Sequence, residues 1–188
     1  MAPVRVHFVR HGKAAAGWDG HRDPGLDPLG LTQARLVADR LATLAPMDLV
    51  SSPLARARET AEPLAAIWAR EIIIEPRVAE IPSPSDDLAE RSRWLQDAMR
   101  RNWTELGAPW TDWRAALVDY LLGLERDTVI FSHFIAINAA VGHAEGDDAL
   151  VRFRPDNCSV TTLVIDGSGG DRRLVVESRG DEAVTHVG

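Results

Sequence analysis

The stretch VRVHFVRHG, residues 4–12, decides the fold of this chain. It predicts a short buried β-strand over residues 4–9 that stops at Arg10-His11-Gly12. Open α/β sheets bind their ligands at the carboxyl ends of the strands, so this strand places a guanidinium and an imidazole where a ligand would lie. Gly12 allows the backbone to approach a neighbour closely beside His11. The first strand therefore indicates both a fold class and the position of a site.

Strands and helices alternate along the rest of the chain. Helices are predicted to begin at Thr32, near Ser52-Pro53, at Ser85, at Thr111 and at Phe134. Short strands or extended pieces are predicted between them and after them, over residues 47–50, 72–74, 78–81, 128–131, 159–165 and 173–177. This order predicts a three-layer α/β/α fold, with a mostly parallel central sheet, helices on both faces and a C-terminal antiparallel hairpin. No domain boundary is visible, so residues 1–188 are expected to form a single domain with an accessory helical segment at about 85–124.

Length and composition exclude several classes of protein. A chain of 188 residues, 45% of them hydrophobic, can bury a core that needs neither disulfides nor a structural metal. The single cysteine, Cys158, cannot form an internal bridge, which favours a cytoplasmic location. No window approaches 18 uncharged apolar residues and no signal peptide is visible, so no membrane association is expected.

The charge pattern argues against nucleic-acid binding. Asp and Glu outnumber Lys and Arg 28 to 21, which gives a formal net charge of -7, and no basic tract is present. Nonspecific nucleic-acid binding depends on clustered cations that neutralise many phosphates. Lys13 is the one lysine, so nearly all the cations are arginines, whose planar forks suit phosphate or carboxylate.

Three predicted strand ends carry basic side chains. Arg10 and His11 follow the first strand, Arg56 lies in the first turn after the second, and His133 follows the strand at 128–131. Parallel topology would bring these ends to one edge of the sheet. Two guanidiniums and two imidazoles suit a dianionic phosphoryl group, and the helix start near Ser52 would add unpaired N–H groups.

Several segments, in the same order along the chain, resemble the histidine phosphatase superfamily, the phosphoglycerate-mutase-like proteins. The resemblance covers nearly the whole chain and does not depend on the Arg-His-Gly triplet alone. The matching segments are RHG at 10–12, DPGL at 23–26, SSPLARARETA at 51–61, Glu80, Ser132-His133 and NCSVT at 157–161.

The resemblance implies a metal-independent phosphomonoester hydrolase that acts through a phosphohistidine. His11 would be the nucleophile, while Arg10 and Arg56 would hold the phosphoryl oxygens. His133 would stabilise the charge in transfer as a hydrogen-bond donor, and Glu80 would be the acid and base. No cofactor and no metal are implied, because two arginines and a histidine replace the metal's charge. The expected partner is a small phosphorylated substrate, and a phosphoprotein stays open.

The sequence departs from the family pattern at three places. Lys13 stands where the family often carries Glu or Gln, and would either favour a more anionic substrate or point to solvent. Phe134-Ile135 replaces the usual Gly-Gly after His133, although the backbone N–H of Phe134 could still bind a phosphate. Glu80 is followed by Ile-Pro-Ser-Pro rather than the Gly-x-x-Glu-Gly type of continuation. Substrate choice in such proteins rests on these segments, so the substrate, like the pathway and the oligomeric state, stays open.

Two other functions compete with hydrolysis. A phosphoglycerate mutase would need extra segments that protect the phosphohistidine from water, and the chain is short for one. A non-catalytic module that only binds a phosphorylated ligand is the alternative of another class.

The remaining aromatic and basic residues have simpler interpretations. His7 alternates within a strand and is expected to be packed, and Arg58 is expected to be solvated or locally paired. The other histidines, at 21, 143 and 186, lack the spacing of a zinc site. The tryptophans at 94, 103, 110 and 113 are expected to form a core between the two accessory helices.

Overall fold

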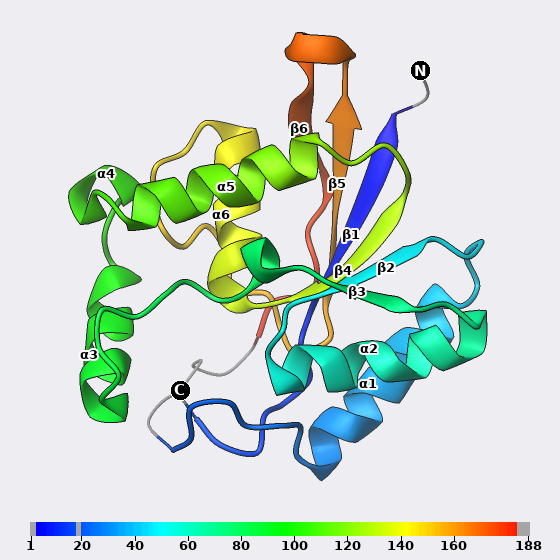
Figure 1. Ribbon diagram of the computed structural model, residues 1–188, viewed down its shortest axis with the longest axis horizontal. Coiled ribbons are helices and arrows are strands. Elements are labelled where there is room, and N and C mark those ends of the chain that lie inside the picture. Colours follow the sequence, from blue (N-terminus) through cyan, green and yellow to red (C-terminus); the bar gives the residue numbers. More distant parts are fainter. Residues whose placement is uncertain (1–2, 18–19, 184–188) are drawn as a thin grey trace.

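The computed structural model describes residues 3–17 and 20–183. Its centre is a six-stranded sheet in the order β3-β2-β4-β1-β5-β6 (Figure 1). The four strands β1 to β4 run parallel, while β5 and β6 form an antiparallel hairpin that joins the sheet beside β1. The predicted fold class and the C-terminal hairpin are therefore confirmed. The strands are β1 (Val4–Arg10), β2 (Asp48–Ser51), β3 (Ile72–Ile74), β4 (Thr128–Ser132), β5 (Val160–Asp166) and β6 (Arg173–Ser178).

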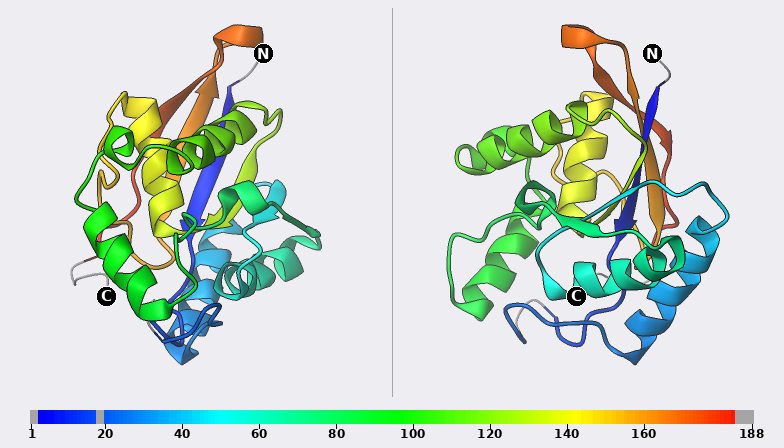
Figure 2. Two further views of the ribbon diagram at one scale, coloured as in Figure 1. Left: turned by 60° about the vertical axis from the view of Figure 1, so that its left-hand side comes forward. Right: turned by 45° about the vertical axis from the view of Figure 1, so that its right-hand side comes forward.

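Helices pack on both faces of the sheet (Figures 1 and 2). One layer contains α1 and α2, and the other contains α5 and α6. None of the helices in the described ranges is both long and apolar enough to cross a membrane. The helices are α1 (Pro28–Leu41), α2 (Ala55–Trp68), α3 (Leu88–Ala98), α4 (Trp103–Leu106), α5 (Trp110–Leu122) and α6 (Phe134–Glu145), with short 3-10 turns at η1 (Pro76–Val78) and η2 (Gly169–Asp171).

The two cores follow from the alternation of side chains along the central strands. Phe8 of β1 and Ile130 of β4 belong to the core under α5 and α6. Their neighbours Val9 and Phe131 belong to the core under α1 and α2. All four side chains are fully buried, because successive residues of a strand point to opposite faces and both faces are covered.

The tryptophans pack against one another in pairs across three helices rather than between the two that were predicted, because residues 103–106 form the additional helix α4, and only Trp103 is fully buried. Trp94 of α3 stacks on Trp110 of α5 with ring centroids 5.3 Å apart, and Trp103 of α4 stacks on Trp113 at 5.9 Å. These aromatic pairs join the three helices α3, α4 and α5, which the sheet does not connect. The aromatic side chains therefore link the helices of this segment to one another.

Several predicted helix starts were wrong by a few residues. The predicted cap of α1, Thr32, lies inside the helix, which begins at Pro28. Asp27 is the N-cap, and its carboxylate accepts a hydrogen bond of 2.7 Å from the Gly30 N–H. Proline at the first helical position fits this start, since it has no N–H to satisfy. In the same way the observed N-caps of α2, α3 and α5 are Leu54, Asp87 and Pro109 rather than Ser52, Ser85 and Thr111.

The segment predicted to be extended over residues 78–81 instead begins at the end of a 3-10 turn, and it joins no strand of the described sheet. Val78 and Ile81 are buried, which explains why their apolar side chains resemble a strand in the sequence. Ser132 at the end of β4 donates a hydrogen bond of 2.7 Å to the Val78 carbonyl. This bond ties the segment, and therefore Glu80, to the carboxyl edge of the sheet.

A close backbone contact supports the loop that follows β1. A Cβ atom on Gly30 would lie 2.2 Å from the Lys13 carbonyl oxygen, and one on Gly12 would lie 2.7 Å from the Gly30 carbonyl oxygen. No side chain fits between the two segments. The first turn of α1 is therefore packed directly against the backbone beside His11.

The Gly30→Ala variant should lower the free energy of unfolding by about 1–3 kcal/mol, because the added methyl group must displace rigid backbone. Urea denaturation measures the change. Gly170→Ala is the matched control, since a Cβ there meets nothing within 4 Å, and its effect should stay within about 0.5 kcal/mol. Equal stability of the two variants would contradict the contact.

Candidate active site

A cavity of about 330 Å³ opens at the carboxyl edge of the parallel strands. Its size lies at the lower end of the range for small-molecule sites, roughly 300–1,000 Å³. The register of the sheet explains its position, because β1 and β4 pair at Arg10 and Ser132 and so end together. Five of the six residues predicted from the sequence line it, namely Arg10, His11, Arg56, Glu80 and Phe134. The sixth, His133, does not line the cavity.

Hydrogen bonds on both nitrogens fix the tautomer of the His11 imidazole. Nδ1 lies 2.7 Å from the Gly12 carbonyl oxygen, which only accepts, so Nδ1 carries the proton. Nε2 accepts a hydrogen bond of 3.2 Å from Nε of Arg56. The lone pair of His11 is therefore on Nε2 and faces the guanidinium of Arg56.

The imidazole of His11 is held in its neutral form. Burial is the main cause that lowers its pKa well below the ordinary value, and the charges of Arg56 and Arg10 lower it further. The bond to the Gly12 carbonyl acts in the opposite direction. A neutral imidazole is the form in which histidine is a nucleophile, once its lone pair is released from the Arg56 hydrogen bond.

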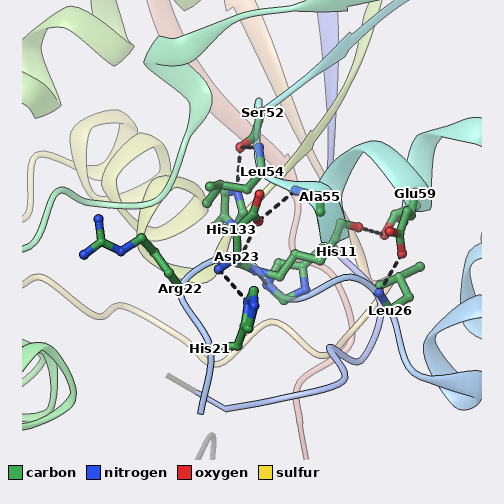
Figure 3. A network of polar contacts seen from close by, with 12 residues as sticks. His11, His21, Arg22, Asp23, Leu26, Ser52, Leu54, Ala55, Glu59 and His133 are labelled. Atoms are coloured by element: carbon green, nitrogen blue, oxygen red, sulfur yellow. Dashed lines mark hydrogen bonds and ion pairs between the residues drawn. The ribbon is translucent and has the colours of Figure 1, made fainter. Parts of the chain in front are cut away.

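Arg56 is buried and is held from several sides. Its Nη1 lies 3.7 Å from a carboxylate oxygen of Asp23. The same oxygen accepts a hydrogen bond of 2.9 Å from the Ala55 N–H (Figure 3). Thr60 donates to the Arg56 carbonyl at 2.6 Å and accepts from the Gly12 N–H at 3.0 Å. The first turn of α2 is therefore bonded to the loop that carries His11.

Arg10 is also buried, but part of its guanidinium has no partner. One terminal nitrogen donates to the Pro155 carbonyl at 2.8 Å. Nε is buried without a hydrogen bond to any residue of the described chain. The guanidinium lies over the ring of Phe134, 5.4 Å from its centroid. Arg10 thus lines the cavity with an unpaired N–H donor buried beside it.

His133 packs next to His11, away from the cavity lining, and is fully buried. The two ring centroids are 5.1 Å apart, and Nε2 of His133 lies 2.7 Å from the Ser52 hydroxyl (Figure 3). Its Nδ1 has no hydrogen-bond partner among the described residues. Burial lowers the pKa of His133 well below the ordinary value, and the charge of Arg56 adds to the effect. This histidine is therefore also neutral.

Glu80, in the segment after η1, is buried beside the N-terminus of α6. One carboxyl oxygen accepts hydrogen bonds of 3.1 Å from the Ile81 N–H and from the Ile135 N–H. Burial raises the pKa of this carboxyl, while these N–H groups and the charges of Arg56 and Arg10 oppose the rise. The net direction is upward, so Glu80 keeps its proton at higher pH than an exposed glutamate would.

Several residues of this network were not assigned from the sequence. Thr60 and Ser52 lie within the motif at 51–61, and Asn157, whose amide donates to the His11 carbonyl at 2.9 Å, lies within the motif at 157–161. Asp23 lies within the motif at 23–26. All four residues therefore belong to motifs that the sequence shows, but the sequence did not indicate which residues they contact. Arg91 of α3 also lines the cavity, and no motif in the sequence indicated it.

Other predictions can be compared directly with the structure. His7 is satisfied by the Thr162 hydroxyl at 3.0 Å, and Arg58 is exposed, as expected. Lys13 lines the cavity and forms an ion pair of 3.1 Å with Asp27. No group of three or more His, Cys, Asp or Glu side chains in residues 3–17 and 20–183 is placed to hold a metal ion. His186 lies outside the described residues.

Comparison with known proteins identifies the family. The model of the histidine phosphatase superfamily (branch 1) matches residues 6–177. The chain belongs to this superfamily. Among its curated relatives is a probable phosphoglycerate mutase GpmB of Photorhabdus laumondii, 40% identical over 209 residues, which cover 98% of this chain and 95% of the relative. A probable GpmB of Yersinia pestis is 28% identical and covers 96% and 94% of the two chains.

Solved structures share the fold. A mycobacterial glucosyl-3-phosphoglycerate phosphatase superposes with a TM-score of 0.73 at 21% identity, over 93% of this chain and 97% of the other. A phosphoserine phosphatase of Entamoeba histolytica, in complex with 3-phosphoglyceric acid, gives a TM-score of 0.71 at 21% identity, over 95% and 97%. The superfamily fold is therefore present over nearly the whole chain.

Nitrogen NMR of the imidazoles tests the protonation states at this superfamily site. His11 should remain neutral, with its proton on Nδ1, as pH falls through the ordinary histidine pKa of about 6.5. The reason is that burial and the charges of two arginines disfavour the imidazolium, so the pKa of His11 in the folded protein is lowered. The same chain unfolded in urea is the control and should titrate near the ordinary value. A proton on Nε2, or titration of folded His11 near 6.5, would contradict the geometry.

Proposed function

We propose that this chain is a phosphatase that hydrolyses small phosphomonoesters through a phosphohistidine on His11. The observation that carries the proposal is the neutral His11 imidazole in a cavity lined by Arg10 and Arg56, with its Nε2 lone pair directed at the Arg56 guanidinium, whose N–H a phosphoryl oxygen would accept in its place. The proposal needs no cofactor and no metal ion. We place the enzyme in the cytoplasm, since its one cysteine, Cys158, is a buried free thiol.

In the first step, Nε2 of His11 attacks phosphorus and the ester P–O bond breaks. Arg10 and Arg56 neutralise the charge on the non-bridging oxygens, as a metal ion does in other phosphoryl-transfer sites. Glu80 gives its proton to the departing alkoxide, so the product leaves as an alcohol. The raised pKa of Glu80 supports this role, because the carboxyl must be protonated before it can act as an acid.

In the second step, the Glu80 carboxylate takes a proton from a water molecule. The water oxygen attacks phosphorus, the P–N bond breaks and phosphate is released. His11 returns to its neutral form and Glu80 to its protonated form, so the site is ready for another cycle.

His133 and Phe134 would contribute donors to the transferring group. Phe134 is the first residue of α6, where the N–H has no partner within the helix and the helix dipole favours an anion. If the Ser52 hydroxyl donates to Nε2 of His133, the proton of that imidazole is on Nδ1, which has no partner in the described chain. Because His133 does not line the cavity, the proposal requires its ring or that of His11 to shift when substrate binds, so that Nδ1 donates to a phosphoryl oxygen.

Phosphoglycerate mutase activity is the second candidate, favoured by the names of the two GpmB relatives. A mutase would return the phosphoryl group to another oxygen of the substrate instead of to water. Phosphorus NMR of a reaction with 3-phosphoglycerate separates the two, since a phosphatase releases inorganic phosphate and a mutase forms 2-phosphoglycerate. Thermal stabilisation by phosphate without turnover of any phosphate ester would instead identify a binding module.

Replacing the nucleophile tests the phosphatase proposal. The wild-type protein should hydrolyse an aryl phosphate in EDTA, and His11→Ala should lower kcat/KM by about a thousandfold or more, because the covalent route is lost. Phosphate release is the measurement. His143→Ala is the matched control, since this imidazole is exposed near the end of α6 and does not line the cavity. Activity that EDTA abolishes, or that survives in His11→Ala, would refute the mechanism.

The leaving group tests the role of Glu80. In single-turnover measurements, Glu80→Gln should slow alkyl phosphates by about 10²–10⁴-fold and activated aryl phosphates far less, because an aryl oxide leaves without a proton. In the wild type, the alkyl rate should fall as pH rises through the raised pKa of Glu80, where the acid is lost. Equal losses on both substrates would exclude Glu80 as the acid.

A further inference from the structure

Asn138 is a fully buried polar side chain that the proposed mechanism does not use. It lies in the second turn of α6, a helix whose other buried residues are almost all apolar. Its amide nitrogen donates a hydrogen bond of 2.9 Å to the Phe134 carbonyl. Its amide oxygen accepts two hydrogen bonds, of 2.6 Å from the Arg152 N–H and of 3.1 Å from the Phe153 N–H. Burying an amide is costly unless it makes such bonds, and Asn138 uses both ends of its amide.

The two N–H groups that Asn138 binds belong to a segment without regular structure of its own. Residues 151–157 contain neither a helix nor a strand, and only an isolated bridge at Pro155. Such a segment has no ladder of hydrogen bonds, so its buried N–H groups need other partners. One amide oxygen satisfies two consecutive N–H groups here. Asn138 therefore fixes this segment against α6.

The same segment holds the side chain of Arg10. Nη1 of Arg10 donates to the Pro155 carbonyl at 2.8 Å, which is the one side-chain hydrogen bond of this guanidinium within the described residues. The ring of Phe134 lies 5.4 Å from the guanidinium carbon and belongs to the turn of α6 that precedes Asn138. The Pro155 carbonyl and the Phe134 ring are therefore both connected to Asn138, one through the segment and the other through the helix.

The other supports of the segment lie nearer the surface. The Arg154 N–H donates to the carboxylate of the exposed Glu182 at 3.2 Å, and the Arg154 carbonyl accepts from the Ala183 N–H at 2.8 Å. Hydrogen bonds at exposed positions open more readily than buried ones. The amide of Asn138 is therefore the buried anchor of the segment that binds Arg10.

We propose that Asn138 is a positioning residue that holds the Arg10 guanidinium at the phosphoryl site through residues 152–155. The inference rests on the proposed function, in which Arg10 binds oxygens of the phosphoryl group. A guanidinium stabilises such a group only at a suitable distance and angle, and small displacements of a catalytic group lower the rate steeply. Asn138 does not line the cavity, so it acts through Arg10 and not on the substrate.

Two substitutions of similar size separate the hydrogen bonds of Asn138 from its volume. Asn138→Leu fills the same space and removes all the bonds of the amide. In Asn138→Asp one carboxyl oxygen can still accept from the Arg152 and Phe153 N–H groups, and the protonated carboxyl can also donate to the Phe134 carbonyl. Asn138→Asp should therefore resemble the wild type, whereas Asn138→Leu should not. Asn138→Ala, which also lacks the bonds, replaces Asn138→Leu if that variant does not fold.

A double-mutant cycle on an aryl phosphate tests whether Asn138 acts through Arg10. Asn138→Leu should lower kcat/KM by about ten- to hundredfold, which corresponds to the loss of a charge-assisted hydrogen bond. In the Arg10→Ala background, the same substitution should cause a further loss of less than about twofold, because the group that it displaces is already absent. A purely structural role would lower kcat/KM by the same factor in both backgrounds, and that result would overturn the proposal.

Thr128→Val is the matched control for lost stability. Thr128 is buried at the start of β4, at the opposite end of the strand from Ser132, and does not line the cavity. Its hydroxyl donates to the Arg126 carbonyl at 2.8 Å, so the variant also loses a hydrogen bond of a buried side chain. It should lower the melting temperature but leave kcat/KM within about twofold of the wild type.

Nitrogen NMR of the Arg10 guanidinium separates failure of this inference from failure of the proposed function, because it needs no turnover. The Nη signals of Arg10, assigned by their absence in Arg10→Ala, should exchange slowly in the wild type, since Nη1 is bonded to the Pro155 carbonyl. Asn138→Leu should speed the exchange, and Asn138→Asp should keep it slow.

If the wild type shows this pattern but hydrolyses no phosphate ester, the phosphatase proposal fails and the positioning of Arg10 by Asn138 stands. Fast exchange in the wild type, or exchange that stays equally slow in Asn138→Leu, would overturn the positioning role even in an active enzyme.

Discussion

The hydrogen bonds on the two nitrogens of His11 are the constraint on which the rest of the site depends. The Gly12 carbonyl holds the proton on Nδ1, and Nε of Arg56 donates to Nε2. Each bond requires a particular part of the fold. The first needs the close packing of Gly12 on Gly30, and the second needs the first turn of α2 to meet the end of β1. The parallel register of β1, β4 and β2 supplies that meeting point.

Burial shifts the pKa values of the proposed nucleophile, His11, and the proposed acid, Glu80, in opposite directions. Loss of water disfavours every charged form, so it lowers the pKa of the His11 imidazole and raises that of the Glu80 carboxyl. Burial thus shifts both groups toward their neutral forms, which the proposed first step would use. Arg10 and Arg56 stay charged because a guanidinium is not deprotonated in proteins. The cavity is therefore cationic even though the chain as a whole is acidic.

The sequence predicted the fold class and identified five residues that line the cavity, because both depend on local signals. Strand ends in a parallel sheet share one edge, so Arg10, His11 and Arg56 could be brought together from the order of elements alone. Helix starts were misplaced where two candidate caps lie close together, as with Asp27 and Thr32. The buried position of His133 behind His11, and the presence of Arg91 at the cavity, depend on tertiary packing that no local pattern encodes. The Ser52 hydroxyl was assigned to a helix cap, whereas it also bonds to His133.

Direct detection of the covalent intermediate is the most decisive measurement. Wild-type protein mixed with a phosphomonoester and quenched in alkali within one turnover should carry one phosphoryl group, stable to alkali and labile to acid, and peptide mass spectrometry should locate it on His11. It should form and decay at least as fast as phosphate is released. A protein that turns over substrate without such a group, or that carries it on another residue, would contradict the account.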